Sequence, residues 1–591
     1  MSSTQWLRGC IAAMFTSGLA LTVGAILASQ VITRGQHPFV SDPTLATVLP
    51  SAGAAFVASL PLAIVVGLLA TDLGPMWRGL LLGFLVIAVT FTGLRQNAVG
   101  DPPTLNIESI PYLSEEALES STPDKSSDSP PHIVLITIDT LRWDHVGFAG
   151  YTRPVTPRLD ELASRGTVYA HAIAQAPATN SSMASMSTGL YPHVIEYERK
   201  EREGAGAFVA EGLHMIAERL ALGGYETAAF VSNPYLKANN GFAQGFEHFD
   251  EDTGMFRSIG NARQHNASHL VDATLAWLDE RSSDRPLFLW LHILDPHHPY
   301  EPAEPAPWEN PNAQPFRSFA AEYDAMSVRE MTDHFQALSQ DDGALRPGEL
   351  DYLIGRYDGE ILQSDREVGR LLDHLDQIGF SPSNTLYMVT SDHGEEFFDR
   401  GGMLHSHHLH DELIRVPLIV AGPGFAAEVE EERQARLIDL APTMMVAAGL
   451  PMEGFDGVAL QHDEPTPHAL SFRGLGEVSL RTFDHKLYAE YHTRFWYICR
   501  TGNPYTDLHR LFVARYGRGL WRPERQPEVY DLVNDPGETS ALTDEATINR
   551  LFCQLADELE QHPPRLIAGR TSSNGLSADD IEHLRNLGYV E

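Results

Sequence analysis

The feature that most constrains this chain is a regular alternation of short apolar runs and helical segments, which begins at residue 132. The runs are rich in β-branched residues, and segments with helical periodicity stand between them at 156–166, 269–281 and 348–379. Continuous apolar strands separated by helices predict an α/β fold with a doubly wound, mostly parallel sheet covered on both faces. The predicted strands are 132–138, 227–232, 287–293, 385–390 and 416–420.

Polar side chains gather where three of these strands end. In open α/β sheets, ligands bind at the carboxyl ends of the strands, so these residues are expected to meet at one edge. Carboxylates combined with imidazoles suit a divalent cation, and zinc, manganese, calcium and magnesium all remain open. The residues are Asp139 after the first strand, His292, Asp295, His297 and His298 at the end of the third, and Asp392, His393, Glu395 and Glu396 after the fourth.

The charge of the chain excludes one class of partner. The 591 residues have a formal net charge of −37, while the first hundred residues are nearly uncharged. Nucleic acids require clustered Lys and Arg to neutralise phosphates, so no nucleic-acid partner is expected. Instead, the sequence predicts an acidic soluble body joined to an uncharged N-terminal segment.

That N-terminal segment contains three apolar stretches, at 10–32, 52–71 and 79–94. Each is close to the ~20 residues that a membrane-spanning helix needs. Three such runs without a small-residue cleavage site favour a three-helix transmembrane anchor at 1–98 over a signal peptide. Residues 99–131 are rich in Pro, Ser and acidic residues, which predicts a flexible linker. Arginines flank the spans equally on both sides, so charge does not orient the anchor.

From residue 132 onward, the body contains a series of motifs in a recognisable order: HIVLITIDTLRWDHVGFAGY (132–151), SSMASMSTGLYPH (181–193), DPHHPYEP (295–302), YDGEILQSDREVGRLLDHL (357–375), SDHGEEF (391–397), HSHHLHDELIRVPLIVAGPG (405–424) and EVYDLVNDPGE (528–538). In these motifs, the body resembles the sulfatase-like family of the alkaline phosphatase superfamily. The resemblance covers residues 132–591. It implies a catalytic domain at 132–460, and a C-terminal subdomain at 461–591 with a small antiparallel sheet and a packed helix. It also implies a periplasmic or extracellular catalytic domain, tethered here to the membrane.

The family comparison places Thr179 where sulfatases have the Cys or Ser that is oxidised to formylglycine. Threonine cannot undergo that oxidation, so no formylglycine is expected. Thr179 is similar to the threonine nucleophile of phosphoethanolamine and phosphoglycerol transferases in the same superfamily. The resemblance implies that Asp139, Asp392 and His393 hold the metal together with the Thr179 oxygen.

The same comparison implies roles for the remaining polar residues. His297 and His407 are expected in catalysis, as groups that bind the ester oxygens or protonate the leaving group. Substrate contacts are expected from His292, His405 and Ser182. Two positions depart from the family pattern: Thr140 replaces the second Asp of an Asp-Asp pair, and Met183 replaces an Arg or His. The second change is expected to remove a cation from the anion pocket.

The choice between sulfate and phosphate esters is open at this point. A formylglycine hydrate can expel sulfate by collapsing to the aldehyde, whereas a threonine intermediate needs a second in-line attack, which is familiar at phosphoryl centres. The leading prediction is therefore a metal-dependent hydrolase of sulfate or phosphate esters that uses Thr179. One alternative is a phosphotransferase acting on a lipid or an envelope glycan. A second is a catalytically inactive, membrane-tethered binding protein.

Overall fold

The computed structural model of this chain describes residues 130–195, 209–210, 213–251, 266–304, 308, 348–462, 468–474, 477–490 and 527–562, which all belong to one compact unit, Glu108–Glu591. Within these ranges, no helix is long and apolar enough to cross a membrane. The three predicted spans, and the predicted linker up to residue 129, lie outside the described residues. The membrane anchor therefore stays a prediction.

The body is built on a central sheet whose middle strand is β1 (His132–Ile138). β1 pairs in parallel with β5 (Leu287–Ile293) and with β6 (Thr385–Thr390), as the apolar runs predicted. In the part of the chain that is described, this sheet has nine strands in the order β11-β2-β10-β6-β1-β5-β3-β4, with β9 paired to β2. The other strands are β2 (Thr167–Ile173), β3 (Glu226–Val231), β4 (His248–Asp250), β9 (Arg415–Val416), β10 (Leu418–Ala421) and β11 (Val429–Arg436).

The sheet is mostly parallel, with one departure on the β2 side. The predicted strand at 416–420 is divided into β9 and β10, and both parts run antiparallel to their neighbours. Pro417 lies at the break, where its missing N–H cannot join a ladder. Three further strands of this sheet escaped the sequence prediction: β2, the short β4, and β11, whose sequence VEEERQAR has no apolar run.

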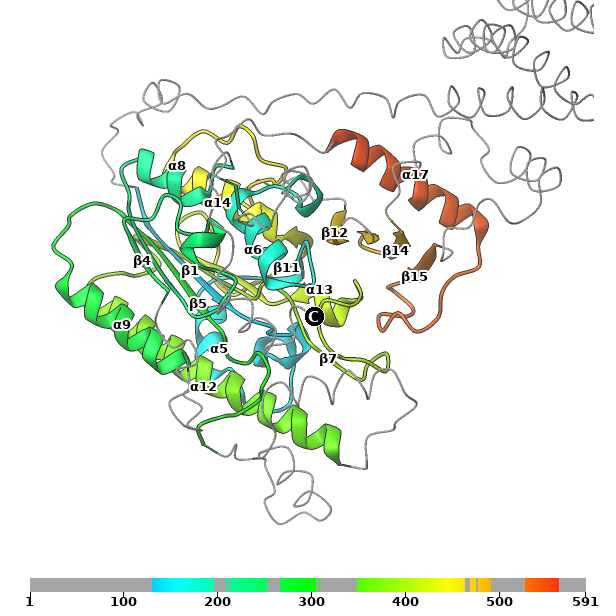
Figure 1. Cartoon of the computed structure of the whole chain (residues 1–591), viewed down its shortest axis with the longest axis horizontal. Helices are drawn as coiled ribbons and strands as arrows, with labels where there is room; N and C mark the ends of the chain where they lie inside the picture. The colour runs from blue at the N-terminus through cyan, green and yellow to red at the C-terminus, as the bar shows by residue number, and fades with distance from the viewer. Residues whose placement is uncertain are drawn as a thin grey trace, which may run out of the picture. The chain divides into compact units, whose positions relative to one another are not determined.

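Helices cover both faces of the sheet, as Figure 1 shows. Side chains of β1 alternate between two hydrophobic clusters, with Ile133 and Leu135 in one and Val134, Ile136 and Ile138 in the other. The first cluster includes residues of α6 (Thr179–Thr188), α8 (Ile216–Leu222) and α14 (Leu440–Ala448). The second includes residues of α5 (Pro157–Ser164), α9 (Asn266–Glu280) and α12 (Glu349–Gln377).

A smaller antiparallel sheet follows residue 460, in agreement with the family resemblance. Its strands are β12 (Ala469–Arg473), β13 (Glu477–Arg481), β14 (His485–Glu490) and β15 (Glu528–Asp531). Leu551, Leu555 and Leu559 lie on one face of α17 (Glu545–Gln561) and share a hydrophobic cluster with this sheet. The domain boundary at 460 itself stays a prediction.

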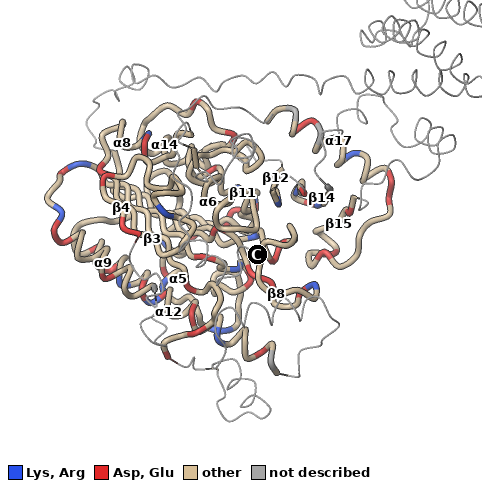
Figure 2. Tube along the Cα trace, viewed as in Figure 1, with Lys and Arg blue, Asp and Glu red and all other residues tan. Residues whose placement is uncertain are grey.

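The remaining short elements surround the edge of the large sheet where its parallel strands end. They include a hairpin of β7 (Glu396–Phe397) and β8 (Met403–Leu404), and the single-turn helix α13 (Asp411–Ile414). The 3-10 turns are η1 (Trp143–His145), η2 (Gly147–Ala149), η3 (Ala238–Asn240) and η4 (Leu437–Asp439). Figure 2 shows acidic and basic residues interspersed along α12, whereas the charged residues within α9 are acidic.

Candidate active site

Two neighbouring strands bring Asp139, Asp392 and His393 together. β1 and β6 are parallel and in register up to Thr137 and Thr390, so the residues that follow them leave the sheet at the same edge. The backbone N–H of Thr140 donates to Asp392 Oδ1 at 3.3 Å, which fixes one loop against the other. The side chains of Asp139, Asp392 and His393 are all fully buried. The structure therefore brings together the three residues predicted as metal ligands.

Thr179 is the first residue of α6, and its side chain reaches the same group of metal-ligand candidates. Its Oγ1 is 3.2 Å from His393 Nε2 and 3.5 Å from Asp139 Oδ2. The N-terminus of a helix has backbone N–H groups without intrahelical partners and a partial positive charge. A tetrahedral anion placed over Thr179 would therefore meet a favourable field.

The spacing of these four side chains fits a divalent cation. His393 Nε2 is 3.5 Å from Asp392 Oδ2 and 3.8 Å from Asp139 Oδ1, too far for hydrogen bonds. Two ligand atoms held at ~2.1 Å by one cation stand about 3.0–3.5 Å apart, close to the spacings observed. Asp139 Oδ1 and Asp392 Oδ2 are also buried without a hydrogen-bond partner in the described part of the chain. The two carboxylates, the imidazole and the Thr179 oxygen could thus hold a metal ion, whose identity the donor set leaves open.

The sequence interpretation missed one member of the site, Asn233. Its Nδ2 donates to Asp139 Oδ2 at 2.6 Å and lies 3.5 Å from Thr179 Oγ1, while its Oδ1 accepts the N–H of Tyr235. Asn233 follows β3, another parallel strand that ends at the same edge of the sheet. The rule that polar residues after strands form the site could therefore have found it.

Two buried imidazoles, His297 and His405, lie beside this group. The ring centroids of His405 and His393 are 4.5 Å apart, and those of His405 and His297 are 5.0 Å apart. Burial lowers the pKa of His297 to about 4, although the Asp139 charge opposes the shift, and burial also lowers the pKa of His405. Both rings are therefore neutral near pH 7. The N–H of His297 is on Nδ1, which donates to the His298 carbonyl at 2.6 Å.

Glu395 fixes the orientation of His405. The distance from His405 Nδ1 to Glu395 Oε1 is 2.9 Å, and the Glu395 side chain is fully buried. Burial raises the pKa of the Glu395 carboxyl to about 7. A carboxyl group bound to one ring nitrogen sets the orientation of the imidazole, as in other carboxylate–histidine pairs.

Two other predicted site residues, His292 and Ser182, contact the metal-ligand group. His292 Nε2 lies 3.4 Å from Asp139 Oδ2, and its Nδ1 is 2.8 Å from Thr137 Oγ1. The Ser182 hydroxyl donates to the Asp392 carbonyl at 2.6 Å, which ties α6 to the loop after β6. Both side chains are fully buried, and these contacts suit residues that orient the ligands.

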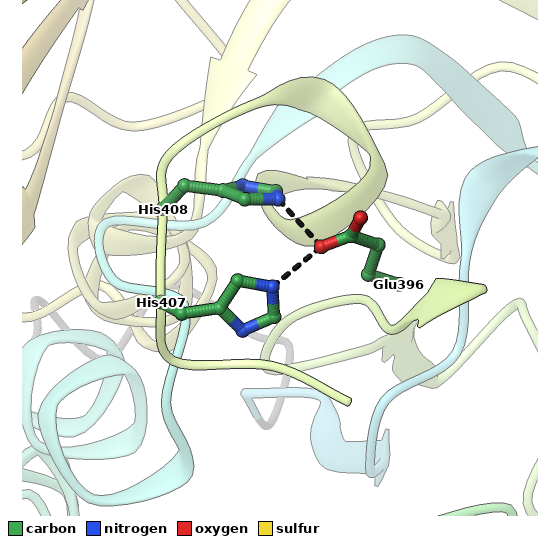
Figure 3. Close-up of side chains that lie close together, drawn as sticks. All are labelled: Glu396, His407 and His408. Atoms are coloured by element: carbon green, nitrogen blue, oxygen red, sulfur yellow. Dashed lines mark hydrogen bonds and ion pairs between the residues drawn. The ribbon is translucent and has the colours of Figure 1, made fainter. Parts of the chain in front are cut away.

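His407 lies in a separate group with Glu396 and His408, shown in Figure 3. Its Nε2 is 2.5 Å from Glu396 Oε2, and His408 Nε2 is 2.9 Å from the same oxygen. Glu396, His407 and His408 each offer one possible ligand atom, and these three atoms lie close enough together to consider a bound cation. However, 2.5 Å is too short for two ligands of one metal and matches a direct hydrogen bond between charged groups.

The second nitrogen of His407 supports this interpretation. Nδ1 is 2.9 Å from the His405 carbonyl, which can only accept, so this nitrogen bears a proton. The pairing of Nε2 with the Glu396 carboxylate then requires a second proton. Burial opposes this charge, but the hydrogen bond with Glu396 raises the pKa of His407 overall. His407 is thus an imidazolium that holds the His405 backbone.

Met183, which replaces a family cation, lies in the protein core. Its side chain is fully buried within the cluster that includes Ala184, Met186 and residues of α14. The sequence suggested only that Met183 removes a cation from the anion pocket. In the structure, Met183 packs against apolar neighbours, which leave no room for a solvated charge at this position.

Comparisons with known proteins agree with this architecture. A family model described as Sulfatase matches residues 131–450. Arylsulfatase K of Rattus norvegicus is 22% identical over 446 residues, which cover 70% of this chain and 75% of the rat protein. A solved 2-O GAG sulfatase superimposes with a TM-score of 0.54 at 19% identity, covering 73% of this chain and 93% of that one. The phosphonate monoester hydrolase of Agrobacterium radiobacter gives a TM-score of 0.52 at 20% identity, with 73% and 96% covered.

The fold and the family model together define the class. The chain belongs to the sulfatase family and has the α/β fold of its solved members. Its family supports a sulfuric ester hydrolase, and the relatives named above give the transferase alternative no support.

Proposed function

We propose that this protein is a metal-dependent hydrolase of sulfuric esters in which Thr179 attacks the transferred group. The observation that supports this most directly is the position of Thr179 Oγ1, 3.2 Å from His393 Nε2 and 3.5 Å from Asp139 Oδ2. A hydroxyl at a helix N-terminus, among buried ligands for a cation, meets the requirements of a nucleophile. A divalent cation bound there would supply the positive charge that lowers the pKa of this hydroxyl and offsets charge on the transferred group.

The side chains around Thr179 have separate tasks in this proposal. Asn233 holds the Asp139 carboxylate and approaches the Thr179 oxygen, so it fixes both before substrate arrives. His405 donates an N–H to the ester oxygens. The single N–H of neutral His297 is bound to the His298 carbonyl, so this ring offers no second donor. As the ester bond breaks, His405 gives its Nε2 proton to the leaving oxygen while its Nδ1 takes the proton of the neutral Glu395 carboxyl, so the ring stays neutral. His407, by contrast, is engaged with Glu396 and the His405 carbonyl and is assigned a positioning role.

Thr179 also favours a second candidate function, the hydrolysis of phosphoric diesters or phosphonic monoesters. A group bound to a threonine oxygen leaves only after a second in-line attack, a step familiar at phosphorus. The likeness to a phosphonate monoester hydrolase is a likeness of fold, which can accommodate this chemistry. Sulfate monoesters and these phosphorus esters share a single negative charge, which suits a site with two neutral imidazoles.

We further propose that the N-terminal apolar stretches anchor the protein in a membrane, with the catalytic body in the periplasm or outside the cell. Their lengths support this, and the substrate would then lie in or near the membrane. Fractionation of cells that express the whole chain, with and without residues 1–98, tests the anchor. Release of the full chain by salt alone would contradict it.

A panel of esters tests the proposed activity. The full chain, loaded in turn with calcium, zinc, manganese and magnesium, is assayed with aryl sulfate, aryl phosphate diester, aryl phosphonate monoester and aryl phosphate monoester. Preferred turnover of sulfate supports the leading proposal, and preferred turnover of the diester or phosphonate supports the second. Metal binding without turnover of any ester would favour the inactive binding protein.

A further inference from the structure

The loop that carries His405 has an unusual backbone. Leu404 and Ser406, the two neighbours of His405, both have positive φ, at 72° and 73°. Residues other than glycine rarely adopt this left-handed backbone conformation, and each one that does so costs on the order of 1 kcal/mol of folding free energy. A loop of this kind keeps its shape only where surrounding contacts determine it.

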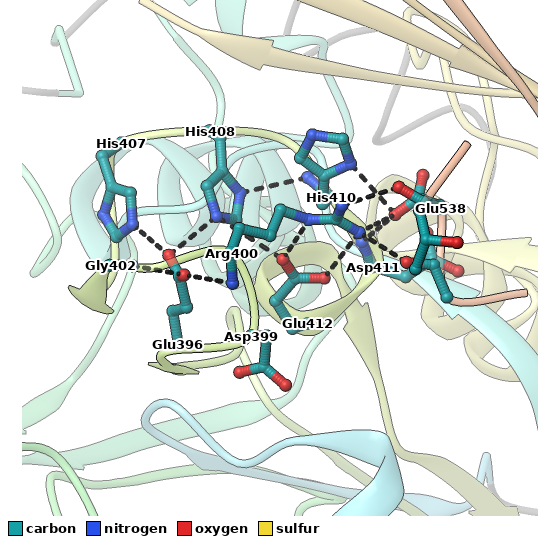
Figure 4. Close-up of polar contacts among 12 residues, drawn as sticks. Glu396, Asp399, Arg400, Gly402, His407, His408, His410, Asp411, Glu412 and Glu538 are labelled. Carbon is teal, nitrogen blue, oxygen red and sulfur yellow. Dashed lines mark hydrogen bonds and ion pairs between the residues drawn. The ribbon is translucent and has the colours of Figure 1, made fainter. Parts of the chain in front are cut away.

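The first of these contacts lie within the large domain. His407 donates from Nδ1 to the His405 carbonyl and binds Glu396 through Nε2. The other oxygen of Glu396, Oε1, accepts the backbone N–H of Arg400 at 2.8 Å. The Arg400 side chain continues outward, where its Nη1 donates to the Glu538 carbonyl at 2.7 Å. Figure 4 shows this series of contacts, which reaches from the His405 loop to the C-terminal part.

A second set of contacts joins the far end of the loop, at His410 and Asp411, to Glu538 as well. Glu538 Oε2 accepts the backbone N–H of Asp411 at 2.8 Å and lies 3.2 Å from His410 Nδ1. Its other oxygen, Oε1, is 2.8 Å from Lys486 Nζ, which is also 2.8 Å from Asp411 Oδ1. Arg481 pairs with the second Asp411 oxygen at 3.1 Å. Lys486 and Arg481 belong to β14 and β13 of the small sheet.

Burial makes this cluster costly to assemble and costly to break. Glu538, Lys486 and Arg481 are each at most 2% exposed. Two carboxylates and two cations balance in charge, but removing one partner from a buried group leaves an uncompensated charge. A cluster of this kind is a weak source of stability, so a role in specifying the loop conformation is the better account of it.

From these contacts, we propose that Glu538 is a positioning residue through which the C-terminal sheet holds the His405 loop in its proton-donating arrangement. The inference rests on the proposed function of His405. The sulfatase-family motif at 528–538 thereby acquires a physical role, because its last residue joins the small sheet to the loop.

Leaving groups of different basicity separate positioning from simple stability. An ester with a good leaving group, such as 4-nitrophenol, needs little protonation, whereas an alkyl ester depends on the acid. We therefore compare Glu538→Gln with wild type in the metal-loaded full chain, using aryl and alkyl esters of the class that wild type hydrolyses. kcat should fall roughly 10–100-fold for alkyl esters and less than about 3-fold for the nitrophenyl ester.

Glu558→Gln is the matched control, since Glu558 is a buried carboxylate of α17 that pairs with His468 at 2.6 Å outside the His405 loop. It should leave the dependence on leaving group unchanged. Equal slowing of all esters by Glu538→Gln, or an unchanged dependence, would overturn the proposal. If Glu538→Gln does not fold, Glu538→Asp is tested in the same series and by the same criterion. Failure of the proposed function is distinguishable, because wild type would then hydrolyse no ester or Thr179→Ala would remain active.

Discussion

Asn233 donates a 2.6 Å hydrogen bond to the same Asp139 oxygen that lies 3.5 Å from the Thr179 hydroxyl. One amide therefore orients a metal ligand and lies against the nucleophile. Replacing Asn233 by Ala should lower both metal affinity and kcat/KM by roughly 10–100-fold, because the Asp139 carboxylate loses its support. Metal titration and steady-state kinetics measure the two effects.

The control for this substitution is Asn240→Ala, since Asn240 belongs to the same loop region and donates to the Tyr235 carbonyl without reaching Asp139. It should leave metal affinity within about threefold of wild type. An equal loss in both variants would mean that the loop backbone, and not the Asn233 amide, supports the site.

Metal removal should destabilise the body as well as stop turnover. Without a cation, Asp139 and Asp392 are two fully buried carboxylates, each with one oxygen that has no hydrogen-bond partner among the described residues. A ligand present at 100 times its Kd stabilises the native state by about 2.7 kcal/mol, so adding the correct metal to chelated protein should raise Tm. Thermal unfolding with each metal measures this. The rise should be absent in Asp392→Asn, and a rise of equal size in that variant would place the metal elsewhere.

Met183 should tolerate apolar replacement only. Met183→Leu conserves volume and should cost less than about 1.5 kcal/mol of unfolding free energy. Met183→Arg introduces the Arg that the family has at this position, but it buries an unpaired charge in the core. It should therefore cost at least ~3 kcal/mol of unfolding free energy. Urea denaturation gives both values. An active, stable Met183→Arg protein with altered substrate preference would show that this position faces the anion pocket.

The stability of the body should fall as pH rises through the titration of Asp365. Burial raises the pKa of this carboxyl from 3.8 to about 7, despite hydrogen bonds from the backbone N–H groups of Arg158 and Leu159. The folded state therefore retains a proton that the unfolded state releases near pH 4. This contribution is fully present below about pH 4 and is lost by about pH 7, and it amounts to ~2–4 kcal/mol. Urea midpoints between pH 4 and 8 should decline less in Asp365→Asn, and parallel declines would contradict the shift.

Much of the fold could be predicted because its central strands are continuous apolar runs. β1, β5 and β6 begin and end where the sequence indicated, and their ends bring together Asp139, Asp392 and His393. Edge elements were harder to predict. β11 has alternating exposed and half-buried residues in its first half, and the direction of β10 depends on how the chain returns after a long loop.

The site was predictable to the extent that it depends on strand ends. Asn233 follows a parallel strand, as Asp139 does, but its side chain is uncharged and was not recognised as part of the site. The neighbouring histidines were a different problem, because His405 and His407 are two residues apart and nothing in HSHHLH tells them apart. Only the folded loop, with Glu395 beside one ring and Glu396 beside the other, assigns them different tasks.

The most direct test of the account is the turnover of Thr179→Ala beside Thr179→Ser, in full-length protein with metal content and Tm confirmed for each. If Thr179 is the nucleophile, Ala should lower kcat by about 10³-fold or more, while Ser, which retains a hydroxyl at the same place, should retain measurable turnover. Turnover by Thr179→Ala within about tenfold of wild type would contradict the central claim, because another group would then have to attack the ester.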